Sequence, residues 1–459
     1  MLSAAINFAR AHCDEHLARL CDLVRIPSVS MAPEHGAAME RAVEWLAGLL
    51  RRAGLENVRA LPTPGRPVLC ADWLHAGPQA PTLLAYGHYD VQPTDPLEEW
   101  LSPPFEPEVR GADLYGRGAS DDKGQLLAEI AAAEAYLATA GRLPINLKLL
   151  LEGEEEMSSP HMAAFVREHA GELACDAVLI CDEEMLDPKT PLINYGVRGN
   201  CYMELRVQGP AHDLHSGTFG GAVDNPFNVL VRLLAALQDG DSRRIQIPGF
   251  YDRVRQLEAE EQALLAALPI DDAVVQALTG VPLPAGEAGY TALERTAVRP
   301  TLEIHGLPGG FTGPGKKTVI PAWAGAKVSM RLVPDQEPEE IARLLESYLR
   351  SMVPPTVTLE CRLLGGARPA VVDFRAPAVQ AMARALAEAF GGETRYLRGG
   401  GSLPIVRELQ EAVGAPVVLA GFGLPDDNTH APNEKLHLPI YYGGIEALIR
   451  YYMALGGTE

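Results

Sequence analysis

Apolar residues recur at two spacings along the first 205 residues, and the two patterns alternate. Residues 16–24 and 41–54 carry apolar positions on one face, which predicts amphipathic helices. Short apolar runs within 80–90 and 145–152 predict strands, and both end in charged residues. Buried strands separated by helices are typical of a largely parallel sheet covered on both faces. We therefore expect an α/β fold with its site at the carboxyl ends of the strands.

The pattern changes near residue 205, where the next strand alternates polar and apolar positions. A long helical segment follows around 255–268, and another strand is predicted at 324–334. Residues 376–391 return to the first pattern. We therefore predict a first domain of mostly parallel sheet covered by helices, made of residues 1–205 and 372–459. A second domain, of the α+β type, would be inserted at 206–371.

Composition narrows the functional classes. The 459 residues exceed one ordinary core, and 47% of them are hydrophobic, which favours a globular protein of two domains. The net charge of -21 argues against nucleic acid and anionic membranes as partners. Seven cysteines occur without a C-x-x-C pair, and the N-terminus resembles an amphipathic helix more than a signal peptide. We expect a cytoplasmic protein without a sulfur-ligated zinc site.

Charged residues follow the apolar runs at three strand ends and in two loops. "GHYD", "EGEEE" and "CDEE" end the strands, and "GRGASDDKG" and "DDNTHAPNEK" form the loops. Each alone has an ordinary explanation: a His–Asp pair in a polar turn, two Asp at a helix N-terminus, a solvated acidic turn or a loop His. Together they supply the ligands of a two-metal hydrolytic centre. Without cations, these carboxylates would be buried like charges.

Eight motifs in sequence closely resemble the dizinc aminoacylase/carboxypeptidase superfamily, in particular its cytosolic nonspecific dipeptidase and carnosinase branch. They extend from about residue 85 to 440 and are "GHYDVQP", "GRGASDDKG", "LEGEEEMSS", "YGVRGNCYMEL", "HDLHSGTFGG", "KKTVIPAWAGAKVSMRLVP", "RGGGSLPI" and "THAPNEKL".

The resemblance implies two divalent metal ions, with zinc expected and manganese or cobalt as alternatives. Asp121 would bridge both ions and would be joined to Asp122 by a cis peptide bond. Asp90 would orient His88, and on an extended chain these two residues do project from the same side. The implied metal ligands are His88, Asp121, Glu156, Asp182 and His430.

Three consecutive glutamates raise a question of register. Aligning Gly153 and the following "MSS" with the family pattern makes Glu154 variable, Glu155 the general base and Glu156 a ligand. Strand periodicity favours the same assignment, since Glu154 and Glu156 would share a side. The alternative register, with Glu154 as base and Glu155 as ligand, stays open.

The resemblance also implies that residues 1–205 and 372–459 form the catalytic domain and that the insertion at 206–371 is a lid and dimerisation domain. Substrate contacts would come from the inserted domain and from the Gly-rich loop that carries Ser402. His215 would reach the active site of the partner subunit of a homodimer, where it stabilises the oxyanion. Arg331 would pair with the substrate carboxylate, and Thr318 and Ser402 would contact substrate. A polar hairpin His and a surface Arg are the ordinary alternatives. His212, His305 and Lys123 are assigned structural or supporting roles.

Three functions remain in competition. The favoured one is hydrolysis of dipeptides or short peptides with a free C-terminal carboxylate. The second is an N-acyl-amino-acid deacylase or an acyl-diamine hydrolase. The third is a metal-binding scaffold without catalysis, which would be expected to lack the base or a ligand; neither is missing.

Overall fold

The computed structural model describes residues 1–457 and divides into two compact units. The first unit comprises Met1–Tyr195, Val372–Leu397 and Ile405–Glu459, and the second comprises Gly196–Val371 and Arg398–Pro404. The second unit begins earlier than the predicted residue 206, because the strand Gly199–Gln208 pairs entirely with strands of that unit. Each unit is described by itself.

The first unit is built on an eight-stranded mixed sheet with the strand order β1-β2-β6-β3-β7-β18-β8-β17. Its centre, from β6 to β18, is parallel, whereas β1 and β2 pair antiparallel. The predicted α/β class is confirmed. The strands are β1 (Glu56–Leu61), β2 (Val68–Trp73), β3 (Thr82–His88), β6 (Asn146–Glu152), β7 (Ala177–Cys181), β8 (Leu192–Asn194), β17 (Arg395–Leu397) and β18 (Val417–Ala420).

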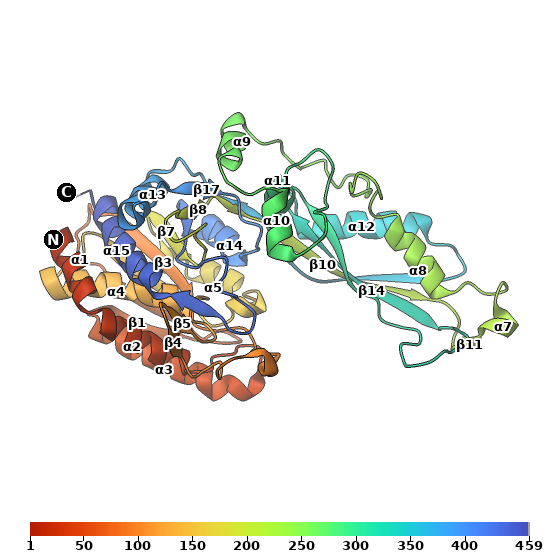
Figure 1. Cartoon of the computed structure of the whole chain (residues 1–459), viewed down its shortest axis with the longest axis horizontal. Helices are drawn as coiled ribbons and strands as arrows, with labels where there is room; N and C mark the ends of the chain where they lie inside the picture. The colour runs from red at the N-terminus through yellow and green to blue at the C-terminus, as the bar shows by residue number, and fades with distance from the viewer. Residues whose placement is uncertain (458–459) are drawn as a thin grey trace. The chain divides into compact units, whose positions relative to one another are not determined.

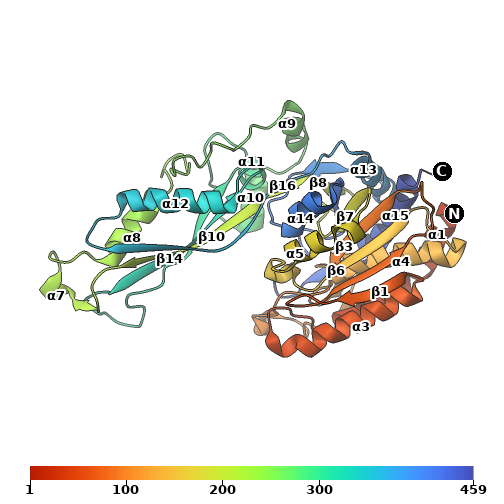
Figure 2. The same ribbon diagram turned by 180° about the vertical axis from the view of Figure 1, so that it is seen from behind.

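Helices cover both faces of this sheet, as Figures 1 and 2 show. Helices α4, α13 and α15 lie together on one face, and α5 lies on the other. Helix α4 is buried along almost its whole length, which explains why its sequence lacks a polar face. The helices are α1 (Leu2–Ala11), α2 (Cys13–Val24), α3 (Gly36–Arg52), α4 (Lys123–Ala140), α5 (Met162–Glu168), α6 (Ala170–Leu173), α13 (Pro377–Phe390), α14 (Pro404–Val413) and α15 (Leu438–Leu455).

A small three-stranded sheet of the first unit joins two distant chain segments. Strands β4 (Glu108–Arg110) and β5 (Asp113–Tyr115) form a hairpin, and β19 (Lys435–His437) pairs antiparallel with β5. This pairing brings the loops before α4 and before β19 next to each other.

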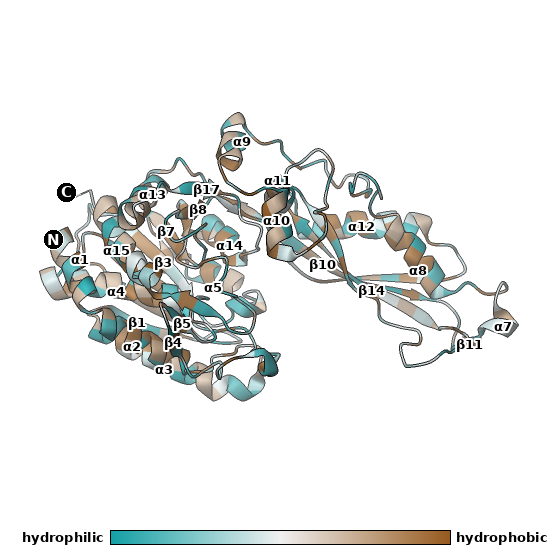
Figure 3. Cartoon of the chain, in the orientation of Figure 1, coloured by the Kyte–Doolittle hydropathy of each residue, from teal (hydrophilic) through white to brown (hydrophobic). Residues whose placement is uncertain are grey.

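The second unit contains a four-stranded antiparallel sheet with the order β12-β14-β10-β15. Buried and half-buried residues alternate along β10, as expected for a sheet with one covered face. The core lies between this sheet and helices α8 and α12, and Figure 3 shows α8 as largely hydrophobic. These elements are β10 (Gly199–Gln208), β12 (Thr301–Gly306), β14 (Trp323–Leu332), β15 (Thr358–Ala367), α8 (Pro226–Ala235) and α12 (Pro338–Met352).

Shorter elements complete the second unit. The helix predicted around 255–268 is shorter than expected, because the Glu258 amide donates to the Glu261 carboxylate and starts helix α9 at Ala259. The remaining elements are β9 (Gly196–Val197), β11 (Leu214–His215), β13 (Val319–Ile320), β16 (Ala370–Val371), α7 (Ser216–Phe219), α9 (Ala259–Ala266), α10 (Asp272–Thr279) and α11 (Ala292–Ala297). Among residues 1–457, no helix is both long and apolar enough to cross a membrane.

Candidate metal centre

Three parallel strands end at the same edge of the large sheet. His88 is the last residue of β3 and pairs in register with Glu152, the last residue of β6. Asp182 directly follows β7, the other neighbour of β3. Because the strands are parallel, side chains from these three ends and the residues after them gather at one place.

The first group of metal-binding donors consists of His88, Asp121 and Asp182. His88 Nε2 lies 3.1 Å from Asp121 Oδ1 and 3.8 Å from Asp182 Oδ2. Asp121 comes from the loop that leads into α4, and the predicted cis peptide bond between Asp121 and Asp122 is present. The Asp122 carboxylate accepts a hydrogen bond from the His88 amide at 2.9 Å, which links this loop to β3.

The second group consists of Asp121, Glu156 and His430. His430 Nε2 lies 2.8 Å from Asp121 Oδ2 and 3.4 Å from Glu156 Oε2. Asp121 therefore belongs to both groups, with one carboxylate oxygen facing each histidine. This is the arrangement in which one carboxylate can bridge two ions.

The residues present fit a pair of cations. The buried His88 Nε2 atom has no hydrogen-bond partner among the described residues, although it faces two carboxylates. Burial raises the pKa of Glu156 to about 10, and it also raises the pKa of Asp182. Buried carboxyls that must ionise need compensating positive charge, which divalent metal ions supply.

Asp90 contacts both His88 and the turn that carries the glutamates. The ring nitrogen Nδ1 of His88 lies 3.1 Å from the Asp90 carbonyl and 3.4 Å from the Asp90 carboxylate. The same carboxylate accepts the amides of Glu155 and Glu156 at 3.2 and 3.1 Å. Asp90 thus lies where it can hold His88 in one tautomer and also fix the turn that carries the glutamates.

The three glutamates occupy different surroundings. Glu154 is buried and pairs with His161 at 2.6 Å, outside both donor groups. Glu156 joins the second group and also accepts a hydrogen bond from Gln92 at 2.6 Å. Within residues 1–457 the Glu155 carboxyl has no hydrogen bond or ion pair, and burial raises its pKa well above the ordinary value.

Strand periodicity does not explain how the three glutamates are directed, so that part of the prediction was wrong. The positions of Glu154 outside the donor groups and of Glu156 within one of them nevertheless agree with the register that has Glu155 as the base. Strand β6 ends at Glu152, and Glu155–Met157 form a 3-10 turn. The backbone therefore stops alternating before the glutamates begin, and the turn, not the strand, directs them.

The predicted substrate residues all lie in the second unit, as two separate pairs. Arg331 on β14 donates to the Ser402 hydroxyl at 2.8 Å. His215 ends β11 opposite Val319, and the neighbouring Thr318 carbonyl accepts the Ser216 amide at 3.1 Å. The exposed His215 ring accepts the Gly217 amide at 3.0 Å.

Sequence reasoning missed three polar residues around the centre. Gln92 contacts Glu156, and Arg117 and Glu434 form a buried pair at 2.8 Å beside Asp121. Glu434 stands in the "APNEK" motif, where its position after the histidine loop was the available signal. Lys123, assigned a supporting role, is buried and donates to the Ile26 carbonyl at 2.7 Å.

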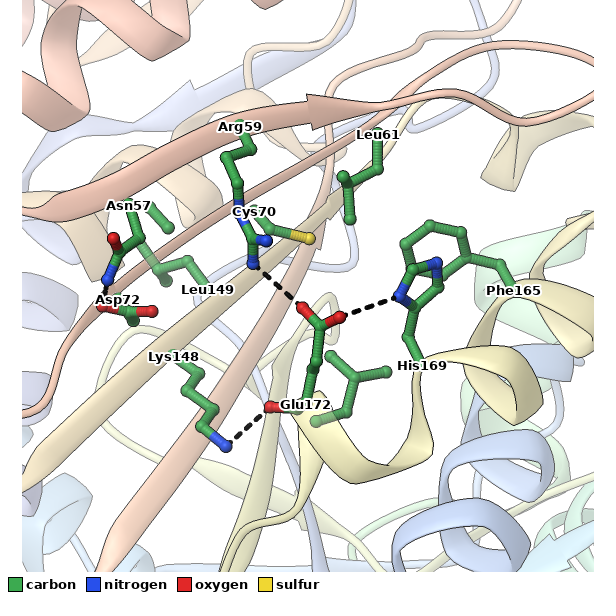
Figure 4. Close-up of a pocket in the computed structure, with 12 residues that line it drawn as sticks. Asn57, Arg59, Leu61, Cys70, Asp72, Lys148, Leu149, Phe165, His169 and Glu172 are labelled. Carbon is green, nitrogen blue, oxygen red and sulfur yellow. Dashed lines mark hydrogen bonds and ion pairs between the residues drawn. The ribbon is translucent and has the colours of Figure 1, made fainter.

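Another concave feature of the first unit lies between β1, β2, β6 and the helices α5 and α6 (Figure 4). Its cavity of about 30 Å³ is large enough for about two water molecules. The polar groups around it already have partners: Arg59 pairs with the Glu172 carboxylate at 3.0 Å, and Lys148 donates to the Glu172 backbone carbonyl at 2.7 Å. This pocket therefore offers no room for a substrate.

Comparison with known proteins supports the same chemistry. Human Beta-Ala-His dipeptidase is 32% identical over 99% of this chain and 93% of its own length. The structure of the dipeptidase Dug1p from Saccharomyces cerevisiae matches with a TM-score of 0.85 and 29% identity, covering 100% of this chain and 99% of that one. An M20 metallo-carboxypeptidase from Sulfolobus solfataricus matches with a TM-score of 0.85 and 31% identity, over 96% and 99%.

A family model also matches most of the chain. Residues 84–454 match the model described as peptidase family M20/M25/M40. Metallopeptidases of this family use a dinuclear metal site, and the two donor groups that share Asp121 are the candidates for it here. The predicted resemblance is confirmed, and the chain belongs to peptidase family M20/M25/M40.

Proposed function

We propose that this enzyme hydrolyses the peptide bond of dipeptides or short peptides that carry a free C-terminal carboxylate. The observation that carries the proposal is the Asp121 carboxylate shared by two donor groups, with the Glu155 carboxyl, which has no partner in the described part of the chain, in a nearby turn. The relatives named above as dipeptidases resemble this chain over nearly its whole length.

The dinuclear centre would be held by His88, Asp121 and Asp182 on one side, and by Asp121, Glu156 and His430 on the other. Bound ions would supply Lewis-acid activation of the scissile carbonyl and a water molecule of lowered pKa. We expect zinc, while manganese and cobalt suit the same ligands.

Proton transfer falls to Glu155. Its carboxylate would accept a proton as water attacks the carbonyl and would return that proton to the leaving amine. Asp90 binds the amides of Glu155 and Glu156, so it holds the base and a ligand in one turn. Burial favours the neutral form of Glu155, which suits the step in which it donates.

Recognition of the substrate carboxylate would fall to Arg331, whose guanidinium makes charge-assisted hydrogen bonds. Its bond to the Ser402 hydroxyl orients it, and a substrate carboxylate would approach this Arg331–Ser402 pair. Both residues belong to the second unit, Arg331 near the end of β14 and Ser402 in the segment Arg398–Pro404.

The second predicted pair supports a homodimer. His215 and Thr318 precede β14, whereas Arg331 is the ninth of its ten residues. A strand of this length spans about 30 Å, far more than a dipeptide. If all of these residues contact one substrate, as the resemblance implies, His215 and Thr318 must come from the partner subunit.

Substrate hydrolysis by a metal-analysed preparation tests the proposed function. Dipeptides with a free carboxylate should be cleaved, and the corresponding N-acyl amino acids should be poor substrates. Preferential cleavage of N-acyl amino acids would replace the proposal by the deacylase function, which the comparisons do not favour.

We also propose a cytoplasmic location, since all seven cysteines are unpaired.

A further inference from the structure

The Glu434 carboxylate lies directly before β19 and is fully buried. Its Oε2 atom accepts hydrogen bonds from Arg117 Nη1 and the Gly118 amide, both at 2.8 Å. Its Oε1 atom accepts the amides of Ser120 and Asp121 at 3.0 and 3.1 Å. One carboxylate therefore binds the whole backbone segment that presents the shared ligand.

Further contacts tie the same segment to the loop that carries His430. Arg117, only 1% exposed, donates to the Ala431 carbonyl at 3.2 Å. The Ser120 hydroxyl donates to the Asp427 carboxylate at 2.8 Å. We refer to these contacts of Arg117, Ser120, Asp427 and Glu434 as the Glu434 clasp.

The loop that the clasp holds does not adopt a relaxed backbone. Asn428, His430 and Asn433 have φ angles of 55°, 60° and 64°, in the left-handed region. Such residues persist when surrounding contacts fix them, since each costs of the order of 1 kcal/mol. The position of the His430 ring therefore depends on contacts from outside its own loop.

The two donor groups differ in how they are supported. His88 ends strand β3, and Asp182 follows strand β7, so both are placed by the large sheet. His430 lies in the strained loop, and the small sheet and the clasp join this loop to the segment that carries Asp121. Loss of the clasp should loosen one donor group more than the other.

We propose that Glu434 is a positioning residue that fixes Asp121 relative to His430. It thereby sets the affinity for the metal ion of the second donor group (Asp121, Glu156 and His430), called the second ion below. The inference rests on the dinuclear centre of the proposed function. Glu434 touches neither substrate nor reacting atoms, and it acts through the two ligands whose loops it joins.

A glutamine at this position would preserve volume but change the hydrogen bonding. The carboxylate accepts from four donors, whereas an amide offers one acceptor oxygen and brings two donor hydrogens. Arg117 would also keep a buried charge without its counter-ion, which is costly. The segment before Asp121 would shift to relieve these contacts.

Titration of the metal-free protein with Zn²⁺ or Co²⁺ tests the proposal. The unsubstituted protein should bind two ions, and Glu434→Gln should bind the second ion about 10- to 100-fold more weakly while the first changes little. Glu134→Gln is the matched control, because it removes a half-buried Glu134–Arg19 pair in the same unit without touching either ligand loop. It should leave both affinities unchanged.

A purely structural role would give a different pattern. In that case the metal-free Glu434→Gln protein would be less stable to heat, but its two metal affinities would be unchanged or equally reduced. Unchanged affinities or an equal reduction of both would overturn the proposal. If this variant fails to fold, Ser120→Ala removes one clasp bond and should still weaken only the second ion, whereas unchanged second-ion binding overturns the proposal. Unsubstituted protein that binds fewer than two ions would instead contradict the proposed dinuclear centre.

Discussion

Asp121 is the residue that organises the candidate site. Burial opposes its ionisation, but the imidazole rings of His430 and His88 beside it outweigh burial and lower the pKa of Asp121 below its ordinary range. Burial instead raises the pKa of Glu155 well above the ordinary value and that of Glu156 to about 10. The two histidines thus hold one carboxylate ionised, and the remaining carboxyls need further positive charge.

The first prediction distinguishes the roles of adjacent glutamates. Glu155→Gln should retain both metal ions but lower kcat by about 100- to 10,000-fold, because an amide cannot accept the proton of water. Glu154→Gln should change kcat only a few-fold, since Glu154 pairs with His161 outside the donor groups. Steady-state kinetics with metal analysis measure both. An inactive Glu154→Gln together with metal loss in Glu155→Gln would place the register one residue earlier.

At the scale of elements, strand ends and the turns after them position the chemistry. The ends of β3, β6 and β7 were predictable, because charged residues directly follow the apolar run of each strand. The 3-10 turn at Glu155–Met157 was not predictable from the strand period, since it is fixed by the distant Asp90 carboxylate. Local pattern specified the elements, and long-range hydrogen bonds specified the turn.

Helix α2 carries a group that should make stability depend on pH. Burial lowers the pKa of His16 to about 4, and its Nε2 atom has no partner among the described residues. The unfolded chain therefore binds more protons between about pH 6.5 and 4, so stability from the neutral His16 is present above this range and is lost as pH falls through it. The loss amounts to at most about 3 kcal/mol.

Chemical unfolding of the metal-free protein at several pH values measures this second prediction. His16→Gln should flatten the decrease in unfolding free energy between about pH 6.5 and 4. His75→Gln provides the control for the removal of a histidine, because the His75 side chain is 59% exposed. An unchanged profile in His16→Gln would show that other groups cause the decrease.

At the scale of the whole molecule, the family and the α/β class were predictable because their signals are local motifs in a fixed order. The contact between Arg117 and Glu434 was not, since 317 residues separate them and the small sheet of β4, β5 and β19 has little periodicity. The assignment of the ligands and of the substrate residues stays a prediction that experiment must test.

The third prediction concerns assembly. Mixed subunits of inactive His215→Ala and inactive Glu155→Gln chains should recover up to about half the activity of a normal dimer, because one centre would have both groups. The reason is the span of β14, which separates His215 from Arg331 within one chain. Absence of activity after verified subunit exchange would mean that His215 acts within its own chain or not at all.

Anomalous diffraction from zinc-loaded crystals would show whether the Asp121 carboxylate bridges two metal ions. We expect two zinc peaks about 3.5 Å apart, one on His88, Asp121 and Asp182 and the other on Asp121, Glu156 and His430. A single peak, or two peaks that do not share Asp121, would contradict this expectation.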